Sequence, residues 1–207
     1  MSEPDIQQYC NLMEEIKRRT GVVDFFLGGK GHALYQPTTI ESICLQLRKI
    51  LELIAFGSLV ANKESYSAVY AKFATNWNAR LLLRDLERVN PDFYPKPVVE
   101  VPSPDPKVRR HLENRQLDYM TKQEFERIYE KCGAMMHADN PYGSRIDYKY
   151  YLERLPAWRT QAVNLLSNHQ VRLLNEKGFY LIHMKENQDD KVHFYRFEPA
   201  PPGPTGG

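Results

Sequence analysis

The sequence predicts a mostly α-helical protein, in which a bundle of five to six helices precedes a C-terminal β-hairpin and a flexible tail. Apolar residues recur at three- and four-residue steps along most of the chain, which is typical of helices that bury one side. Two runs rich in aromatic and β-branched residues follow near the C-terminus. With 207 residues, 42% of them hydrophobic, the chain supplies one full core. We therefore expect a helical domain in residues 1–176, an appended hairpin in residues 177–198 and a disordered tail in residues 199–207.

The first predicted helix covers residues 5–19, where Ile6 and Met13 lie on one apolar stripe, and Gly21 is expected to end it. Residues 22–34 combine an apolar run with three glycines, so a short strand with a turn and a crossover loop both stay open. The Gly-Gly-Lys-Gly sequence in this segment lacks the spacing of a phosphate-binding Walker loop. It is therefore interpreted as a turn that glycine permits.

The second predicted helix opens at Pro37, takes its cap from Thr38 or Thr39, and runs to about Asn62. It is apolar on nearly every side, so we expect it to lie in the middle of the bundle. A third helix is predicted over residues 66–89, and the prolines that follow should end it.

Prolines interrupt the second half of the bundle. Residues 90–106 contain six prolines, which predicts an extended, irregular strap across the bundle surface. The remaining predicted helices cover residues 107–114, 121–137 and 147–176. Thr121 and Glu124 form a capping box at the start of one of them, and Pro156 should kink or split the last.

The predicted hairpin pairs residues 179–184 with residues 192–197 around a polar turn at residues 187–190. We expect it to be an appendage of the helical domain. The tail that follows is rich in proline and glycine, so it cannot bury enough apolar surface to become ordered.

Composition excludes several classes of protein. The charged fraction is 26% and the formal net charge is +2, so any basic site must be local. The acidic N-terminus lacks an export signal, and no apolar window reaches the roughly 20 residues that span a bilayer, so we expect a cytoplasmic protein with no membrane partner. Three widely spaced cysteines and the pair His183 and His193 do not complete a metal site. We expect neither metal nor cofactor.

Three charged residues share a narrow stripe of the apolar second helix. At about 100° per residue, Glu41, Arg48 and Glu52 fall within about 40° of one another. Burying an unpaired charge is costly, so two interpretations stay open. The stripe is either a structural ion-pair ladder, with Arg48 and Glu52 one turn apart, or the lining of a cleft that reaches solvent.

Two further groups are candidates. His137 lies at the predicted end of a helix, where its side chain can cap the helix or project into a groove. Basic residues step by four along the third helix and follow the proline strap. They are Lys72, Arg80, Arg84, Arg88, Arg109 and Arg110. If helix and strap run close together, these residues form a surface for nucleic-acid phosphates; the other interpretation is a solvated helix face.

The sequence from Ile128 to Ala138, preceded by the helix that carries the charged stripe, resembles the HEPN superfamily over about residues 38–175. Many members of that superfamily are metal-independent ribonucleases of toxin, CRISPR-associated or phage-defence systems. They act as dimers whose cleft contains an arginine four to six residues before a histidine. Here Lys131 occupies the arginine's place before His137, and Cys132 replaces the usual polar neighbour.

The resemblance implies that His137 assists attack of a ribose 2′-hydroxyl on the adjacent phosphate while Lys131 or Arg48 steadies the charge that develops. Glu41 and Glu52 would then lie in the same cleft. The leading hypothesis is accordingly a nucleic-acid-directed protein, with RNA as the partner and with ribonuclease activity in antiviral defence or as a toxin.

A homodimer is expected through the helices that bear Trp77 or Trp158. The alternative hypothesis is a non-catalytic interaction or dimerisation module in which the charged stripe is structural. Lysine matches the geometry of a phosphate less well than arginine does, so the Lys131 substitution keeps this alternative open.

Overall fold

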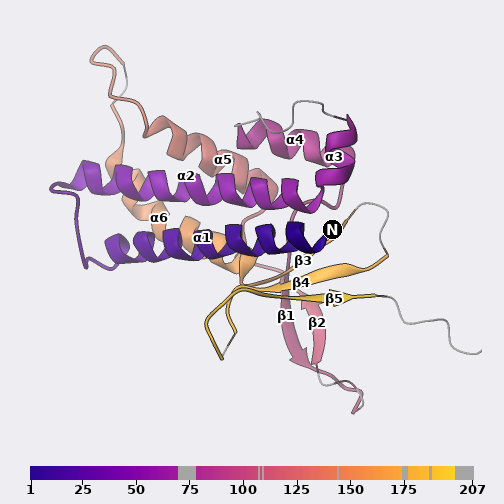
Figure 1. The fold of residues 1–207 in the computed structure, drawn as a ribbon. Helices are drawn as coiled ribbons and strands as arrows, with labels where there is room; N and C mark the ends of the chain where they lie inside the picture. Colours follow the sequence, from indigo (N-terminus) through magenta and orange to yellow (C-terminus); the bar gives the residue numbers. More distant parts are fainter. Residues whose placement is uncertain are drawn as a thin grey trace, which may run out of the picture.

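The computed structural model describes residues 1–69, 78–106, 108, 110–143, 145–173, 177–186 and 188–198. In these residues, helices form one layer and an antiparallel sheet forms a second layer against it (Figure 1). The elements are α1 (Glu3–Leu27), α2 (Gln36–Ala61), α3 (Lys63–Val69), α4 (Ala79–Val89), β1 (Lys96–Pro102), β2 (Arg110–Asn114), α5 (Lys122–Ala134), α6 (Tyr148–Leu166), β3 (Asn168–Val171), β4 (Phe179–His183) and β5 (His193–Phe197). None of the described helices is long and apolar enough to cross a membrane.

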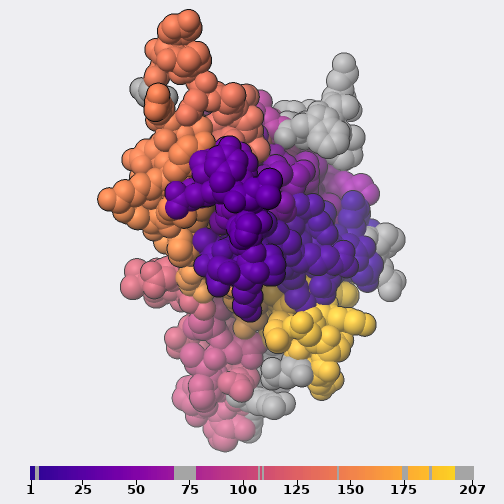
Figure 2. Space-filling view, turned by 90° about the vertical axis from the view of Figure 1, so that its left-hand side faces the viewer, coloured from indigo at the N-terminus to yellow at the C-terminus, as the bar shows by residue number. Residues whose placement is uncertain are grey.

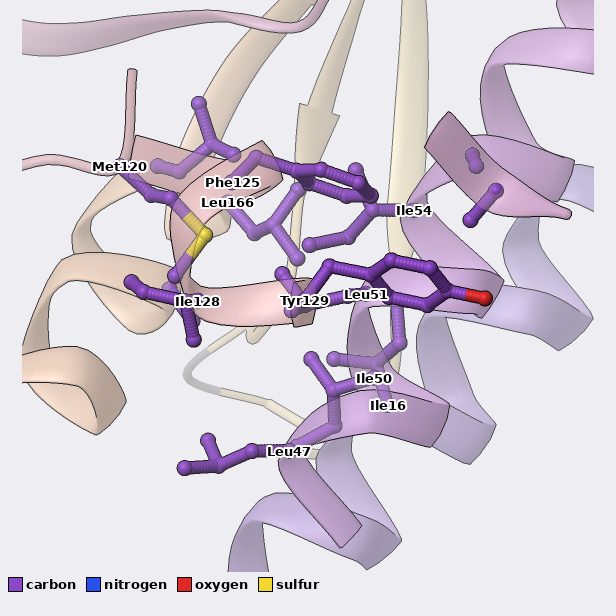
Figure 3. Packing of buried hydrophobic residues seen from close by; sticks show 14 of the residues in the cluster. Ile16, Leu47, Ile50, Leu51, Ile54, Met120, Phe125, Ile128, Tyr129 and Leu166 are labelled. Carbon is purple, nitrogen blue, oxygen red and sulfur yellow. The ribbon is translucent and has the colours of Figure 1, made fainter. Parts of the chain in front are cut away.

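Helix α2 is the centre of the helical layer, as its all-round apolar surface predicts. It packs against α1 on one side and against α4, α5 and α6 on the others. Figure 3 shows Leu47, Ile50 and Ile54 of α2 meeting Phe125 and Ile128 of α5, and all of these side chains are buried. The partly buried charged groups of α2, which are Glu41, Arg48 and Glu52, must therefore find partners close to this packed surface.

The sheet has the strand order β2-β1-β3-β4-β5, and every neighbouring pair is antiparallel. The face of β3 and β4 that meets the helices carries His169, Tyr180 and Ile182, which are buried. β1 pairs with β3 only at Lys96 and Pro97. Beyond that point β1 and β2 extend away from the helices as a two-stranded ribbon (Figure 1).

The first helix is longer than predicted. It runs through Gly21 and ends at Leu27, so the prediction that Gly21 ends it was wrong. Val23 continues the buried stripe, and this packing outweighs the modest cost of a glycine inside a helix. The strand and the crossover loop considered for residues 22–34 are replaced by the end of α1 and a turn. The predicted Thr38 or Thr39 cap was also wrong, because the N-cap of α2 is Tyr35.

The strands exceed the predicted hairpin. The hairpin itself is confirmed as β4 and β5, but it belongs to a five-stranded sheet. The helix predicted over residues 107–114 was wrong, since β2 occupies Arg110–Asn114, and the proline strap contains β1. The last helix ends at Leu166, so its predicted continuation to residue 176 was wrong, and β3 follows. Pro156 lies inside α6 without splitting it. Short strands take their stability from distant partners, which outweigh local propensity.

His169 of β3 is enclosed between the two layers. Its Nε2 lies 2.7 Å from the hydroxyl of Tyr9 in α1, and its Nδ1 lies 2.7 Å from the carbonyl oxygen of Leu166. The carbonyl can only accept a hydrogen bond, so Nδ1 carries the hydrogen and Nε2 accepts from Tyr9. Burial lowers the pKa of His169 from 6.5 to about 4.

We predict that the free energy of unfolding falls as the pH drops from 6.5 to about 4, because the unfolded chain binds a proton at His169 before the folded chain does. The loss is roughly 3 kcal/mol, at about 1.4 kcal/mol per pKa unit. Urea unfolding of the wild type and of His169→Gln at several pH values measures this loss. The variant should lack it, and an equal pH dependence in both proteins would contradict the assignment.

Candidate functional site

A solvent-open hollow lies where α2, α4 and α5 meet, and we name it the α2/α5 hollow. It has a volume of about 590 Å³. Its lining residues are Arg48, Asn78, Arg80, Tyr129, Glu130, Gly133, Ala134, Met136 and His137. Two of the predicted site residues, Arg48 and His137, therefore share one cavity although 89 positions separate them in the chain (137 − 48).

Arg48 is held by contacts to all three guanidinium nitrogens. Its Nε lies 3.3 Å from Oε1 of Glu52, one helical turn along α2. Its Nη1 donates to the backbone carbonyl of Tyr129 at 3.2 Å, and its Nη2 donates to the Tyr129 hydroxyl at 2.7 Å. The guanidinium carbon also lies 3.9 Å from the centroid of the Tyr129 ring, which adds a cation–π contact.

The Tyr129 hydroxyl connects three elements. It accepts from Arg48 of α2 and from the backbone of Ala79 at the start of α4, and it donates to Oε1 of Glu52 at 3.3 Å. Burial, as the largest cause, raises the pKa of Tyr129, so the hydroxyl keeps its proton and can donate at neutral pH. Figure 3 shows the Tyr129 ring beside Leu51 with its oxygen pointing out of the aliphatic cluster. We call Arg48, Glu52 and Tyr129 the Tyr129 cluster.

Gly133 allows the guanidinium to lie directly on α5. A Cβ atom at this position would stand 2.5 Å from Nη1 of Arg48, which is closer than two such atoms can approach. The glycine in the Cys-Gly-Ala-Met-Met-His segment is therefore required by the Arg48 contact rather than by a turn.

Two other predicted residues do not join the hollow. Glu41 lies farther along α2 and accepts from the Tyr148 hydroxyl of α6 at 3.3 Å. Lys131 lies on the side of α5 that faces α6, with Nζ 5.4 Å from the centroid of the Tyr150 ring. The expectation that Glu41 and Lys131 converge with His137 was therefore wrong. On α5, Lys131 is rotated away from the residues that line the hollow, because successive helix positions differ by about 100°.

The described residues of the predicted basic surface lie close to carboxylates or on different elements, and the surface as a whole stays a prediction. Arg80 pairs with Glu130 across the rim of the hollow, and Arg84 and Arg88 lie 3.7 and 3.6 Å from Asp85. Arg110 lies on β2, on the opposite side of the helical layer from α4 (Figure 1). Lys72 and Arg109 lie outside the described residues. Glu130 and the shared Asp85 offset part, but not all, of the positive charge of these three arginines.

Self-association through the helices that bear Trp77 or Trp158 stays a prediction, but the Trp158 side chain is only 1% exposed and packs against Tyr150 and Tyr151, so it belongs to the core. Trp77 lies outside the described residues. In the described part of the chain, no group of three or more histidine, cysteine or acidic residues could hold a metal ion.

Sequence reasoning missed the role of Tyr129. Its position on the apolar stripe of the 121–137 helix indicated a core residue, and its ring is indeed buried. The signal that could have found it is chemical. A tyrosine on a core stripe carries a hydroxyl that needs a partner, and the stripe of α2 offered one.

We predict that Tyr129→Phe lowers the free energy of unfolding by about 1–2 kcal/mol, because it removes a hydrogen-bond partner from both Arg48 and Glu52. Tyr148→Phe is the matched control, since its hydroxyl bonds only to Glu41 at the surface, and it should cost no more than about 0.5 kcal/mol. Chemical denaturation of the three proteins measures both values. Equal losses in the two variants would contradict the role assigned to Tyr129.

The site thus consists of a paired cluster, Arg48, Glu52 and Tyr129, with the exposed imidazole of His137 on the same hollow. Its other polar lining residues are Asn78, Arg80 and Glu130. Comparison with protein-family models, with curated proteins and with solved structures finds no match to this chain.

Proposed function

We propose that the helical layer is a HEPN-like, non-catalytic interaction module in which the charges of α2 hold the helices together. The observation that carries this proposal is the contact set of Arg48. Each of its three guanidinium nitrogens already meets an acceptor within the chain. A guanidinium so engaged stabilises the interface of α2 with α5.

Ribonuclease chemistry would require something different. A cation has to meet the phosphate as negative charge develops, and it has to be arranged for that charge beforehand. Arg48 faces the carboxylate of Glu52 instead, and Lys131 faces the Tyr150 ring. Arg80 is engaged with Glu130. The hollow therefore brings together as many acidic as basic partners, which does not favour a polyanion.

The second candidate function is the metal-independent ribonuclease. One observation favours it: Arg48, Arg80 and His137 line the same open hollow. For this function an RNA phosphate would have to replace Glu52 and the Tyr129 hydroxyl on Arg48. That exchange leaves a partly buried carboxylate without its partner, which costs free energy.

Self-association stays a prediction for this module. The turn between α1 and α2 offers a surface for it, because Leu34 and Tyr35 are 91% and 60% exposed and Phe25 lies nearby on α1. Clustered exposed apolar side chains are typical of contact surfaces between proteins.

We predict that the purified protein does not cleave labelled RNA, with or without a chelator, and that His137→Ala behaves like the wild type. Electrophoresis of the RNA after incubation measures cleavage. Sedimentation of the same samples over a range of concentrations tests whether the chain self-associates.

Two results would contradict the proposal. Cleavage that persists in chelator and disappears in His137→Ala would establish the ribonuclease instead. A mass of one chain at every concentration would contradict self-association. If a larger species is found, a Leu34→Ser variant tests whether the turn between α1 and α2 forms the contact.

A further inference from the structure

We propose that the face of the sheet directed away from the helices binds single-stranded nucleic acid, with bases stacking on Phe179, Tyr195 and Phe197 and phosphates meeting Arg110, Arg115 and Arg172. We name it the outer face. It is separate from the α2/α5 hollow, so this inference does not depend on the function proposed for the helical layer.

The strand register defines the outer face. Side chains of directly paired residues point to the same side of a sheet, and they alternate along each strand. His169 and Ile182 pair and face the helices. Their neighbours therefore point outward, including the pairs Phe179 with Phe197 and Leu181 with Tyr195. Figure 2 shows the yellow C-terminal strands and the pink β1–β2 ribbon below the indigo and purple helices.

The outer face carries a row of aromatic rings. Phe179 and Phe197 are stacked with centroids 5.0 Å apart and planes inclined by 4°. Tyr195 and Phe197 are 42% and 41% exposed, and as alternate residues of β5 they stand roughly 6.8 Å apart along the strand. Exposed aromatic rings on an antiparallel sheet can stack successive bases, because every base has a π-face.

Cations flank this row at both ends. Arg172 lies over Phe179, with its guanidinium carbon 5.5 Å from the ring centroid. At the other end of β4, a hollow of about 390 Å³ is lined by Arg110, Arg115 and His183 among others. The ring of His183 lies 5.1 Å from that of Tyr195, which connects this hollow to the aromatic row.

The arginines of the outer face differ from those of the α2/α5 hollow. Within the described residues, Arg110, Arg115 and Arg172 form no ion pair with a carboxylate, and the Nε atoms of Arg115 and Arg172 are buried without a hydrogen-bond partner. Arg172 reaches only the Gln170 amide, at 3.5 Å. Partly buried guanidinium groups without an anion favour binding of an anionic ligand.

The acidic residues of this face are already engaged. Glu100 Oε1 lies 2.8 Å from Nε2 of His183, and Glu186 Oε1 lies 2.6 Å from its Nδ1. Tyr195 donates to Glu186 at 2.9 Å, which fixes the orientation of its ring. Hydrogen bonds from His183 and then Tyr195 hold the pKa of Glu186 below its usual value. Glu100 and Glu186 are thus held by His183 and Tyr195, whereas Arg110, Arg115 and Arg172 have no carboxylate partner among the described residues.

These features together favour a single strand over other anions. A duplex hides the faces of its bases, so it could use the arginines but not the aromatic row. An acidic peptide would likewise engage only the arginines. An unpaired strand can both stack its bases on the aromatic row and place its phosphates against the arginines.

The test is fluorescence anisotropy with labelled RNA and DNA strands of about 12 nucleotides, a duplex of the same sequence, and polyglutamate. We expect both single strands to bind more tightly than the duplex and polyglutamate, with affinity falling between about 50 and 200 mM salt. Tyr195→Ala with Phe197→Ala should weaken binding about tenfold or more, because two stacking rings are lost. Phe194→Ala is the matched control and should bind like the wild type, because Phe194 is exposed to a similar degree but pairs with Ile182 on the opposite face of the sheet.

A second pair of variants tests the cations. Arg115→Gln with Arg172→Gln should weaken binding and reduce its salt dependence, and Arg154→Gln on α6 is the matched control. Circular dichroism establishes that each variant is folded. The proposal is overturned if no strand binds below about 100 μM, if the duplex or polyglutamate binds as tightly, or if both pairs of variants bind like the wild type. None of these results depends on RNA cleavage. The proposal for the outer face can therefore fail while the function proposed for the helical layer holds, and the reverse is also true.

Discussion

The need to enclose α2 on all sides determines how this protein is built. Its buried residues run from Ile40 to Ala61 on several sides of the helix, although Leu45 is 37% exposed, and no single neighbouring helix can cover them. Helices α1, α4, α5 and α6 therefore surround it. The partly buried charged groups on such a helix meet partners at its contacts, because leaving one of them unpaired costs free energy. Arg48 and Glu52 meet this requirement through Tyr129, which brings α5 and the start of α4 to the same point.

This constraint divides the charges of the protein into two kinds. In the helical layer, Arg48 and Arg80 pair with carboxylates, and Arg159 of α6 forms two hydrogen bonds to Asp24 of α1, both of 2.6 Å. These pairs hold helices together. On the sheet, Arg172 lies over the ring of Phe179, and neither Arg172 nor Arg115 has an acidic partner in the described residues. The first set is explained by the fold itself, whereas the second set is the basis of the proposal that the outer face binds a single strand.

The helices were predictable to the extent that local pattern determines them. Residue spacing located α2 and α5, and the capping box of Thr121 and Glu124 is present as the sequence indicates. Strand β3 was not predictable, because its residues 169–170 pair with the distant residues 96–97 of β1. Strands β1 and β2 lie as close together in the sequence as β4 and β5, but the prolines of residues 90–106 favoured an irregular strap at β1. The hairpin of β4 and β5 was found because both strands are aromatic and β-branched runs around a polar turn.

The candidate site, like the fold, was predictable only where it depends on spacing within one helix. The pairing of Arg48 with Glu52 follows from helical spacing, and it was one of the two interpretations that the stripe allowed. The partner from the other helix did not follow, since 77 positions separate Tyr129 from Glu52. The side of α5 on which Lys131 lies could not be predicted. Its side chain lies about 100° around the helix from that of Glu130, which lines the hollow, and it therefore faces α6. The outer face could not be assembled without knowing that the hairpin joins a larger sheet.

A double-mutant cycle on the Tyr129 cluster tests the central claim that the charges of α2 are structural. Unfolding free energies are measured for Arg48→Met, for the phenylalanine variant at position 129, and for the two changes combined. A coupling of about 1 kcal/mol or more is expected, because each change removes the other's partner. Additivity within about 0.3 kcal/mol would show that the two side chains do not stabilise each other, and it would contradict the claim.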